Sequence, residues 1–182
     1  DEELNWSPDS KSILKEKKKH KGTAAAQSTN TDIYQYNLSN GKTKNLTEDN
    51  TGYDTNPTYS VNGNLAYLSM KTDGYEADKN DIKVISDGVT YNLTGDWDET
   101  VLSYMWANDG KSIYFTAAKD GTIQLFEVNF SGFSGKKSIV TQLTKGDWDI
   151  NAIVGQSGDH LVLTRVSMNR AAELYTFHIK TK

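Results

Sequence analysis

Residues 5–13, "NWSPDSKSI", place a tryptophan before a proline turn and then begin a run that is typical of a β-strand. A second version of this phrase, "MWANDGKSIYF", occupies residues 105–115. The chain carries four aligned copies: "LNWSPDSKSILK" (4–15), "PTYSVNGNLAYLS" (57–69), "SYMWANDGKSIYFT" (103–116) and "AIVGQSGDHLVLT" (152–164). Their anchor residues, Trp6, Tyr59, Trp106 and Val154, lie 53, 47 and 48 positions apart. A period of this size indicates an internal structural repeat.

Two further phrases recur at the same period. The second phrase reads "DIYQYNL" (32–38), "DIKVIS" (81–86), "IQLFEVNF" (123–130) and "ELYTFHI" (173–179). The third phrase closes three of the copies: "KTKNLTED" (42–49), "VTYNLTGD" (89–96) and "IVTQLTKGD" (139–147). Its threonines, Thr47, Thr94 and Thr144, lie 47 and 50 positions apart. Three markers that share one period are not expected by chance.

Each repeat consists almost entirely of short strands. The runs "SIYFT" and "LAYLS" are rich in β-branched and aromatic residues, and "IYQYNL" alternates apolar with polar positions. The turns "VNGN" and "NDGK" place glycine where a positive φ is needed. A repeat of about 47 residues with four short antiparallel strands is typical of one β-propeller blade. We therefore predict an all-β fold, a partial β-propeller of about four blades built from four-stranded antiparallel sheets.

The predicted blades belong to a single domain over residues 1–182. They span about 3–47, 55–94, 101–144 and 150–179, and the last blade lacks its outer strand. In each blade the first phrase supplies the two inner strands, the second phrase the third strand and the third phrase the outermost strand. The anchor aromatic is expected to fill the wedge between neighbouring blades. A sandwich of four hairpin units is the alternative, but sandwich strands rarely repeat sequence phrases in phase.

Composition and charge restrict the classes of function. The chain has 182 residues, including ten Tyr and four Trp, which is typical of a globular domain. Its formal net charge of −4 argues against a general nucleic-acid binder. No apolar run is long enough to span a membrane, and the absence of Cys excludes disulfides and Cys-ligated metal. Because the chain opens on "DEEL" without Met, we expect a piece of a longer protein, and the absence of Cys is compatible with both a periplasmic and a cytoplasmic parent.

The amino-acid sequence of the repeats resembles the N-terminal propeller of the prolyl-oligopeptidase family of serine peptidases. Within that family it is most similar to bacterial dipeptidyl peptidases of the acylaminoacyl-peptidase-like branch. Phrases such as "NWSPDSKSI" and "WANDGKSIYF" also occur in TolB-type propellers, whereas "STNTDIY" followed by "GYDTNP" and "DGYEADKNDI" is more specific to the peptidases. The similarity covers essentially the whole chain and includes "STNTDIYQYNLSNGKTKNLT", "GYDTNPTYS" and "QLTKGDWD".

The resemblance implies a two-part enzyme. A propeller of seven or eight blades caps an α/β-hydrolase domain and admits short peptides, and some propeller loops hold the substrate's N-terminus. We expect this chain to lack the hydrolase domain, because "GQSGD" (155–159) and "GFSGK" (132–136) both fail the pattern Gly-x-Ser-x-Gly. Its three histidines, His20, His160 and His178, suggest no Ser-His-Asp arrangement. The chain itself is therefore predicted to have no catalytic residue, cofactor or peptidase activity, and the parent to be a serine peptidase.

The lysine-rich run "KEKKKHKG" (15–22) is the most charged stretch of the chain. It could attract an acidic peptide or a membrane surface, but we favour a solvated loop between the second and third strands of the first blade. In the related peptidases this stretch and the following "TAAAQSTNTD" form a long loop that faces the catalytic domain. The resemblance therefore makes Gln27, Ser28, Thr29 and Asn30 candidates for substrate contacts. Turn formation and strand entry are their alternative roles.

Two further pairs of residues are candidates for substrate contacts. Glu76 and Asp78, in "YEADKND" (75–81), lie between the second and third predicted strands of the second blade. Their carboxylates could attract the α-amino group of a peptide. Arg165 and Asn169, in "TRVSMNRAAELY", lie in the matching region of the fourth blade.

Paired acidic residues occur at the same place in two repeats. "GDWDET" (95–100) contains Asp96 and Asp98, and "GDWDIN" (146–151) contains Asp147 and Asp149. Such carboxylates can bind Ca²⁺, but neither segment supplies the further oxygens of a calcium loop, so we predict no metal. We expect the aspartates to cap backbone N–H groups and the tryptophans to pack. The N-glycosylation patterns "NLS", "NLT" and "NFS" follow the repeat and are interpreted as structural.

The leading functional hypothesis is a non-catalytic propeller portion of a serine exopeptidase, which gates and orients short peptides for a hydrolase domain. A TolB-like module that binds another protein is the alternative. A sialidase-type glycosidase is disfavoured, because its signature places the Trp after the turn. The expected partners are the hydrolase domain of the parent, short peptides and a second copy bound through exposed blade faces. A monomeric mass in light scattering would contradict this self-association.

Overall fold

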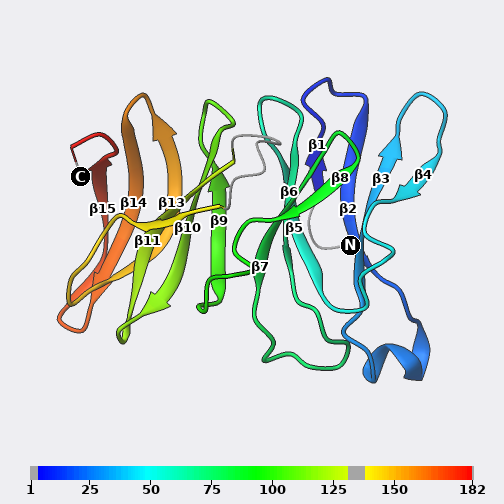
Figure 1. Cartoon of the computed structure of the whole chain (residues 1–182), viewed down its shortest axis with the longest axis horizontal. Helices are drawn as coiled ribbons and strands as arrows, with labels where there is room; N and C mark the ends of the chain where they lie inside the picture. Colours follow the sequence, from blue (N-terminus) through cyan, green and yellow to red (C-terminus); the bar gives the residue numbers. More distant parts are fainter. Residues whose placement is uncertain (1–3, 131–137, 182) are drawn as a thin grey trace. The chain divides into compact units, whose positions relative to one another are not determined.

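The computed structural model describes residues 4–130 and 138–181 (Figure 1). These residues form four antiparallel sheets that follow one another along the chain, together with one 3-10 helix, η1 (Gly22–Ala26). The "GFSGK" segment lies outside the described residues. Contacts divide the chain into two units, residues 1–92 and 93–182, and each unit holds two of the sheets.

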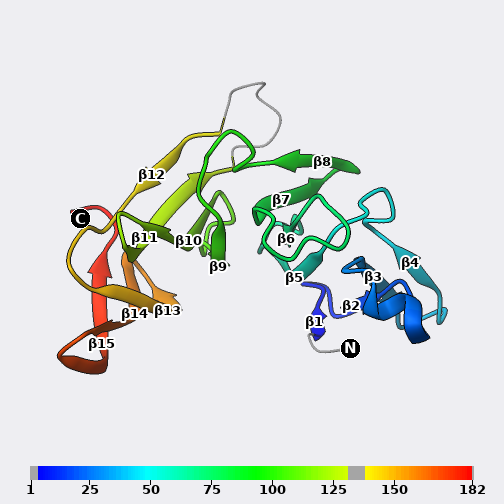
Figure 2. The ribbon, with the colours of Figure 1, turned by 90° about the horizontal axis from the view of Figure 1, so that it is seen from below.

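The first unit contains two four-stranded sheets whose strands pair in chain order. One sheet consists of β1 (Leu4–Trp6), β2 (Ser12–Lys18), β3 (Thr31–Asn37) and β4 (Thr43–Asn45). The other consists of β5 (Asp54–Tyr59), β6 (Leu65–Ser69), β7 (Asp81–Ser86) and β8 (Val89–Asn92). Strand β5 packs against β1, β2 and β3, as Figure 2 shows. Each sheet thus has the strand order predicted from the three phrases.

The second unit contains a four-stranded and a three-stranded sheet. The four-stranded sheet consists of β9 (Val101–Trp106), β10 (Ser112–Lys119), β11 (Thr122–Asn129) and β12 (Val140–Gln142). The three-stranded sheet consists of β13 (Asp149–Ser157), β14 (His160–Ser167) and β15 (Arg170–His178). Strand β13 packs against β9, β10 and β11 of the first of these sheets. Among the described residues, the last sheet has no fourth strand, as its missing third phrase predicts.

The turn of the first phrase has a positive φ at the same place in all four repeats, and in the fourth this residue is Gly158 with φ 56°. Gly63 and Gly110 have φ angles of 80° and 66°, which confirms the positive φ expected for these glycines. Ser10 occupies this place in the first repeat with φ 56°, a conformation that is strained for a residue with a Cβ. The Ser7 hydroxyl donates a hydrogen bond of 2.6 Å to Asp9 Oδ1 in the same turn. Side-chain hydrogen bonding therefore supports the turn that lacks glycine.

The threonine of the third phrase fastens the end of its segment to the third strand of the same sheet. Thr47 Oγ1 accepts the backbone N–H of Ile33 at 3.0 Å, and Thr144 Oγ1 accepts that of Leu125 at 2.9 Å. Thr47 and Thr94 are only 5% and 1% exposed. The threonines of the two "NLT" patterns are thus buried parts of the fold.

Each unit has its own apolar core. The core of the first unit contains Leu14, Ile33, Leu65 and Tyr67. The core of the second unit contains Ala107, Tyr114, Leu125, Leu143, Ile150, Leu161 and Leu163. The second unit also has an aromatic cluster, in which Phe115 stacks on Phe126 and meets the ring of Trp97 edge-on. Tyr114 and Phe115 are neighbours on β10 and are both buried, so both faces of this strand are covered.

The anchor aromatics do not all play the predicted packing role. Trp106 is 8% exposed and lies against Phe130, and Tyr59 packs against the core of the first unit. Trp6, in contrast, is 58% exposed, so the prediction is wrong for the first repeat. Trp6 lies on β1, a three-residue strand at the edge of its sheet. Such a strand offers its side chains few neighbours.

The lysine-rich run is only partly a loop. Residues 15–18 continue strand β2, because the pairing with β3 extends to Lys18 opposite Thr31. The loop proper begins at Lys19, and most of its residues up to Gln27 are exposed. The predicted solvated loop is therefore confirmed from Lys19 onward and is wrong for the first four residues.

Candidate functional site

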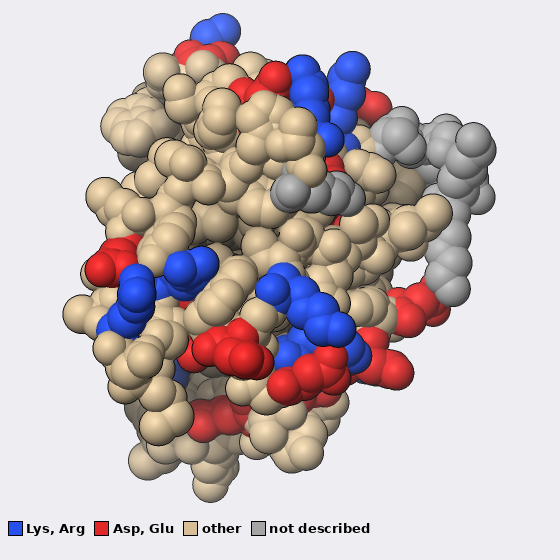
Figure 3. Space-filling view, turned by 90° about the vertical axis from the view of Figure 1, so that its left-hand side faces the viewer, with Lys and Arg blue, Asp and Glu red and all other residues tan. Residues whose placement is uncertain are grey.

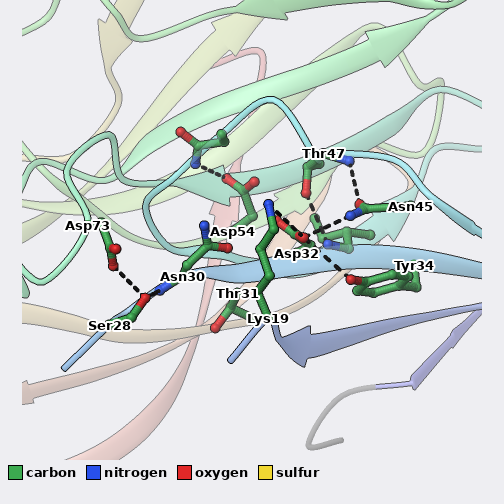
Figure 4. Close-up of polar contacts among 12 residues, drawn as sticks. Lys19, Ser28, Asn30, Thr31, Asp32, Tyr34, Asn45, Thr47, Asp54 and Asp73 are labelled. Carbon is green, nitrogen blue, oxygen red and sulfur yellow. Dashed lines mark hydrogen bonds and ion pairs between the residues drawn. The ribbon is translucent and has the colours of Figure 1, made fainter. Parts of the chain in front are cut away.

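Two loops of the first unit carry six of the predicted contact residues. They are residues 19–30, between β2 and β3, and residues 70–80, between β6 and β7, and we call them the loop pair. Asp73 Oδ1 accepts hydrogen bonds from Ser28 Oγ at 2.7 Å and from the Thr29 N–H at 2.9 Å (Figure 4). The Gly74 N–H donates to Thr29 Oγ1 at 2.9 Å. Hydrogen bonds thus join loops of two different blades.

Asp73 is the residue of the loop pair that the sequence did not reveal. Its pKa lies below the ordinary value because the Ser28 hydroxyl and the Thr29 N–H donate to the carboxylate. The only local signal is the dipeptide Asp-Gly, which is typical of a turn. The ionised form of Asp73 is therefore the one that joins the two loops.

The structure separates the roles of Glu76 and Asp78. Asp78 Oδ2 accepts the backbone N–H groups of Thr72 at 2.8 Å and Lys71 at 3.1 Å. Hydrogen bonds from the Thr72 side chain and backbone lower the pKa of Asp78. Glu76 is exposed and has no hydrogen-bond or ionic partner among the described residues. Asp78 therefore shapes the loop, whereas the carboxylate of Glu76 is available to a ligand.

Gln27 and Asn30 lie at the two ends of the segment that enters β3. The Gln27 N–H donates to Ala24 O at 3.2 Å and ends the 3-10 helix, while its side chain lies at the surface. Asn30 is only 5% exposed, and its N–H donates to Ser28 Oγ at 3.1 Å. Asn30 thus takes part in the entry to β3. Ser28 and Thr29 combine this role with the contact to Asp73.

Polar side chains surround the start of β3 (Figure 4). Asp32 is fully buried, and its Oδ2 accepts Asn45 Nδ2 at 2.8 Å and the Tyr34 hydroxyl at 3.4 Å. Lys19 Nζ lies 3.9 Å from the same oxygen. These contacts fix the beginning of β3, to which the first loop of the loop pair is attached.

Asp54 is a second buried carboxylate, at the first position of β5. Its Oδ1 accepts Ser69 Oγ at 2.6 Å and Asn50 Nδ2 at 2.8 Å. Burial raises the pKa of Asp54 to about 6, although hydrogen bonds from Ser69, Thr47 and Asn50 act in the opposite direction. Because the unfolded chain has an ordinary pKa near 3.8, the folded state binds a proton more tightly at this position.

We expect the first unit to lose stability as the pH rises from about 4 to about 7. The stabilisation from protonated Asp54 is complete below the unfolded pKa and disappears above the folded pKa of about 6. A difference of about two pKa units corresponds to roughly 3 kcal/mol. Asp54→Asn retains an oxygen for Ser69 and Asn50 and should remove most of this slope. Urea unfolding at pH 5 and pH 8 measures it, and an equal slope in the variant would contradict the assignment.

Arg165 and Asn169 lie in the second unit and line one hollow at the β14–β15 hairpin. The Arg165 guanidinium lies 3.6 Å from the ring centre of Tyr175 and 4.9 Å from that of Trp148. Ser167 Oγ donates to Asn169 Oδ1 at 3.0 Å within the hairpin turn. Asn169 therefore stabilises the turn, and Arg165 is held by aromatic rings that the sequence did not associate with it.

The paired acidic segments have the predicted capping and packing roles where the structure describes their contacts. Asp149 Oδ1 accepts the backbone N–H of Ile123 at 2.6 Å. Trp97 packs on Phe115 and Phe126, with ring centres 5.3 and 5.1 Å apart. Residues 4–130 and 138–181 contain no group of three acidic, His or Cys side chains that could hold a metal ion.

The histidines and the "GQSGD" serine show no catalytic arrangement in the described part of the chain. Ser157 ends β13, and its hydroxyl makes no hydrogen bond with a described histidine side chain. The rings of His160 and His178 meet edge-on at 4.7 Å, and His178 Nδ1 accepts the Thr181 N–H at 3.2 Å. Within the described residues, no helix has both the length and the apolarity needed to cross a bilayer.

Comparison with known sequences links the chain to peptidases. No family model matches it. Dipeptidyl-peptidase 5 of Porphyromonas gingivalis is 36% identical over 182 residues, which cover 98% of this chain and 26% of that protein. Dipeptidyl-peptidase 5 of Porphyromonas endodontalis is 34% identical over 176 residues, covering 95% and 25%. The chain therefore spans about a quarter of the length of these curated relatives.

Solved structures share the fold. The acylaminoacyl peptidase of Pyrococcus horikoshii matches with a TM-score of 0.71 at 20% identity, over 96% of this chain and 25% of that one. TolB of Acinetobacter baumannii matches with a TM-score of 0.60 at 19% identity, over 98% and 41%. At these identities the likeness shows the fold alone, and it confirms the predicted partial propeller. Together, the comparisons show that this chain is a stretch of β-propeller that is similar along nearly its whole length to dipeptidyl-peptidase 5, in agreement with the resemblance to peptidases of the prolyl-oligopeptidase family.

Proposed function

We propose that the chain is the non-catalytic propeller portion of a serine exopeptidase and that it gates and orients short peptides for an α/β-hydrolase domain. The observation that carries this proposal is the similarity to dipeptidyl-peptidase 5, which extends over 98% of the chain. The loop pair supports it, because hydrogen bonds hold two loops of neighbouring blades together beside an exposed carboxylate. Loops on a rigid scaffold are the usual place for binding residues.

Within this proposal, Glu76 receives the α-amino group of the substrate. Its carboxylate is exposed on the loop pair, whereas Asp78 and Asp73 use their carboxylates to hold the loops. A charge-assisted hydrogen bond to an ammonium group is stronger than a neutral one. Ser28 and Thr29 then act as positioning residues, because they join their own loop to that of Glu76.

Labelling of the full-length protein with a fluorophosphonate probe tests the enzyme class. Covalent labelling is expected, because such probes react with the activated serine of hydrolases. Absence of labelling in a well-folded full-length protein would favour the TolB-like alternative, a module that binds another protein. The shared fold with TolB supports that alternative only at the level of architecture.

A substitution at Glu76 tests the peptide-orienting role. Glu76→Gln in the full-length enzyme should lower kcat/KM for peptides with a free α-amino group by about tenfold, the effect of one lost charge-assisted contact. N-acetylated peptides should be unaffected. Glu48→Gln is the matched control, because Glu48 is also exposed but lies outside the loop pair. An equal loss for free and acetylated peptides would contradict the role of Glu76.

Self-association stays a prediction. Apolar side chains of the last sheet are exposed among the described residues, with Val154 and Leu174 at 58% and 70%. A further sheet, from this chain's parent or from a second copy, would cover such a face. The expected partners, a hydrolase domain and short peptides, likewise belong to the proposal.

A further inference from the structure

A hollow of about 440 Å³ lies at the end of the β14–β15 hairpin in the second unit. Its volume falls within the range of sites that bind small ligands. Trp148, Arg165 and Tyr175 form part of its wall, and Asp147, Arg170 and Glu173 supply further charges. The hollow belongs to one unit, and its lining residues all lie between Asp147 and Tyr175.

The guanidinium of Arg165 lies over two aromatic rings but is not paired with a described side chain. It lies over the rings of Tyr175 and Trp148, and it has no hydrogen bond or ion pair among residues 4–130 and 138–181. Stacking occupies the faces of a guanidinium and leaves the N–H groups along its edge available. This edge matches the two oxygens of a carboxylate, which Arg binds in a bidentate manner.

The aromatic wall is itself fixed by close packing. A Cβ at Gly146 would come within 2.6 Å of Trp148 Cε2, so the indole lies directly against the backbone of Gly146. The Tyr175 hydroxyl donates to Glu173 Oε2 at 3.0 Å, which holds the second ring. Because both rings are fixed, Arg165 loses little freedom on binding a ligand.

The other charged groups of the hollow do not neutralise Arg165. Glu173 accepts the Tyr175 hydroxyl, and its Oε2 lies 3.9 Å from Arg170 Nη1. Asp147 is exposed at the rim. Figure 3 views the chain from the side of β15 and shows acidic and basic side chains interspersed on that face. A ligand would therefore be selected by hydrogen bonds to Arg165 and not by a surface potential that is positive or negative throughout.

We infer that this hollow is a carboxylate-binding subsite, in which Arg165 receives a carboxylate and Trp148 and Tyr175 contact the group beside it. The inference rests on the proposed function, because that function identifies the ligand as a short peptide. Either the C-terminal carboxylate or an acidic side chain of a peptide supplies the same chemistry.

Binding of three small probes to the full-length protein tests the inference. N-acetyl-phenylalanine should bind about tenfold more tightly than N-acetyl-phenylalanine amide, because only the acid offers a carboxylate to Arg165. N-acetyl-glutamic acid α-amide carries its carboxylate on the side chain, so its affinity shows which of the two sources the subsite accepts. Isothermal titration calorimetry measures all three, and equal affinity for the acid and the amide would overturn the inference.

Variants distinguish Arg165 from the rest of the hollow. Arg165→Met should abolish the tenfold preference, and Gly146→Ala should weaken it by displacing Trp148 without changing any charge. Arg170→Met is the matched control and should retain the preference, since Arg170 pairs with Glu173. A preference that survives in Arg165→Met would overturn the assignment. Fluorophosphonate labelling is independent of these probes, so a labelled protein without carboxylate preference would contradict this inference alone.

Discussion

Replacing Gly52 by alanine is expected to destabilise the first unit by about 3 kcal/mol or more. A Cβ at this position would lie 2.8 Å from the carbonyl carbons of Met70 and Lys71, and closer still to Met70 O. These atoms are backbone, so no side chain can rotate away. The Gly52 carbonyl also accepts the Thr31 N–H at 3.3 Å, and Tyr53 O accepts the Met70 N–H at 2.8 Å. Relief of the clash must therefore break contacts that join the segment before β5 to β3 and to the end of β6.

Chemical unfolding of the Gly52→Ala protein measures this effect. Gly155→Ala is the matched control, because a methyl group added at Gly155 would meet no atom within 4 Å and Gly155 has no positive φ. The control should change the free energy of unfolding by less than about 0.5 kcal/mol. Equal unfolding midpoints for Gly52→Ala and the unmodified protein would show that the approach of Met70 to Gly52 is not tight.

Truncation of Phe115 is the second large effect. Phe115 is fully buried in β10, stacks on Phe126 at 5.5 Å and meets Trp97 edge-on at 5.3 Å. Phe115→Ala leaves a cavity among these rings and should lower the free energy of unfolding of the second unit by roughly 3–5 kcal/mol. Loss of the ring contact should also change the fluorescence of Trp97.

The control for Phe115 lies on the neighbouring strand. Leu102 on β9 is 45% exposed, so Leu102→Ala removes little buried surface and should cost less than about 1 kcal/mol. Denaturant unfolding followed by tryptophan fluorescence compares the two variants. If Phe115→Ala and Leu102→Ala have similar effects, the ring cluster is not a tightly packed part of the core.

The fold could be predicted because its determinants are local and repeated. The positive φ of Gly63 and Gly110 follows from a four-residue turn, and the strands follow from alternation over a few residues. The exposure of Trp6 could not be predicted in the same way. Its repeat phrase is nearly the same as that of Trp106, but the exposure of each ring depends on which strand or sheet lies beside it. Sequence similarity between repeats does not contain that information.

The candidate site is less accessible to prediction, because its contacts join distant parts of the chain. Asp73 holds Ser28 and Thr29 across 45 and 44 positions, and nothing within its own turn indicates a partner. The place of Arg165 in the repeat makes it a candidate, but its stacking on Trp148 and Tyr175 depends on the packing of three separate segments. Asp78 is a candidate because of its charge. In the structure its carboxylate accepts hydrogen bonds from backbone N–H groups of its own loop.

The buried threonine of the third phrase has a consequence for how such a chain can grow during evolution. Thr47 and Thr144 each bond the backbone of a strand from their own repeat, at Ile33 and Leu125. A duplicated gene segment that encodes one repeat therefore also encodes the threonine that bonds the end of the repeat to its third strand. No compensating mutation in the adjacent repeat is needed for that bond. The number of blades can then change by duplication or loss of whole repeats, while every copy keeps the hydrogen bond between its threonine and its third strand.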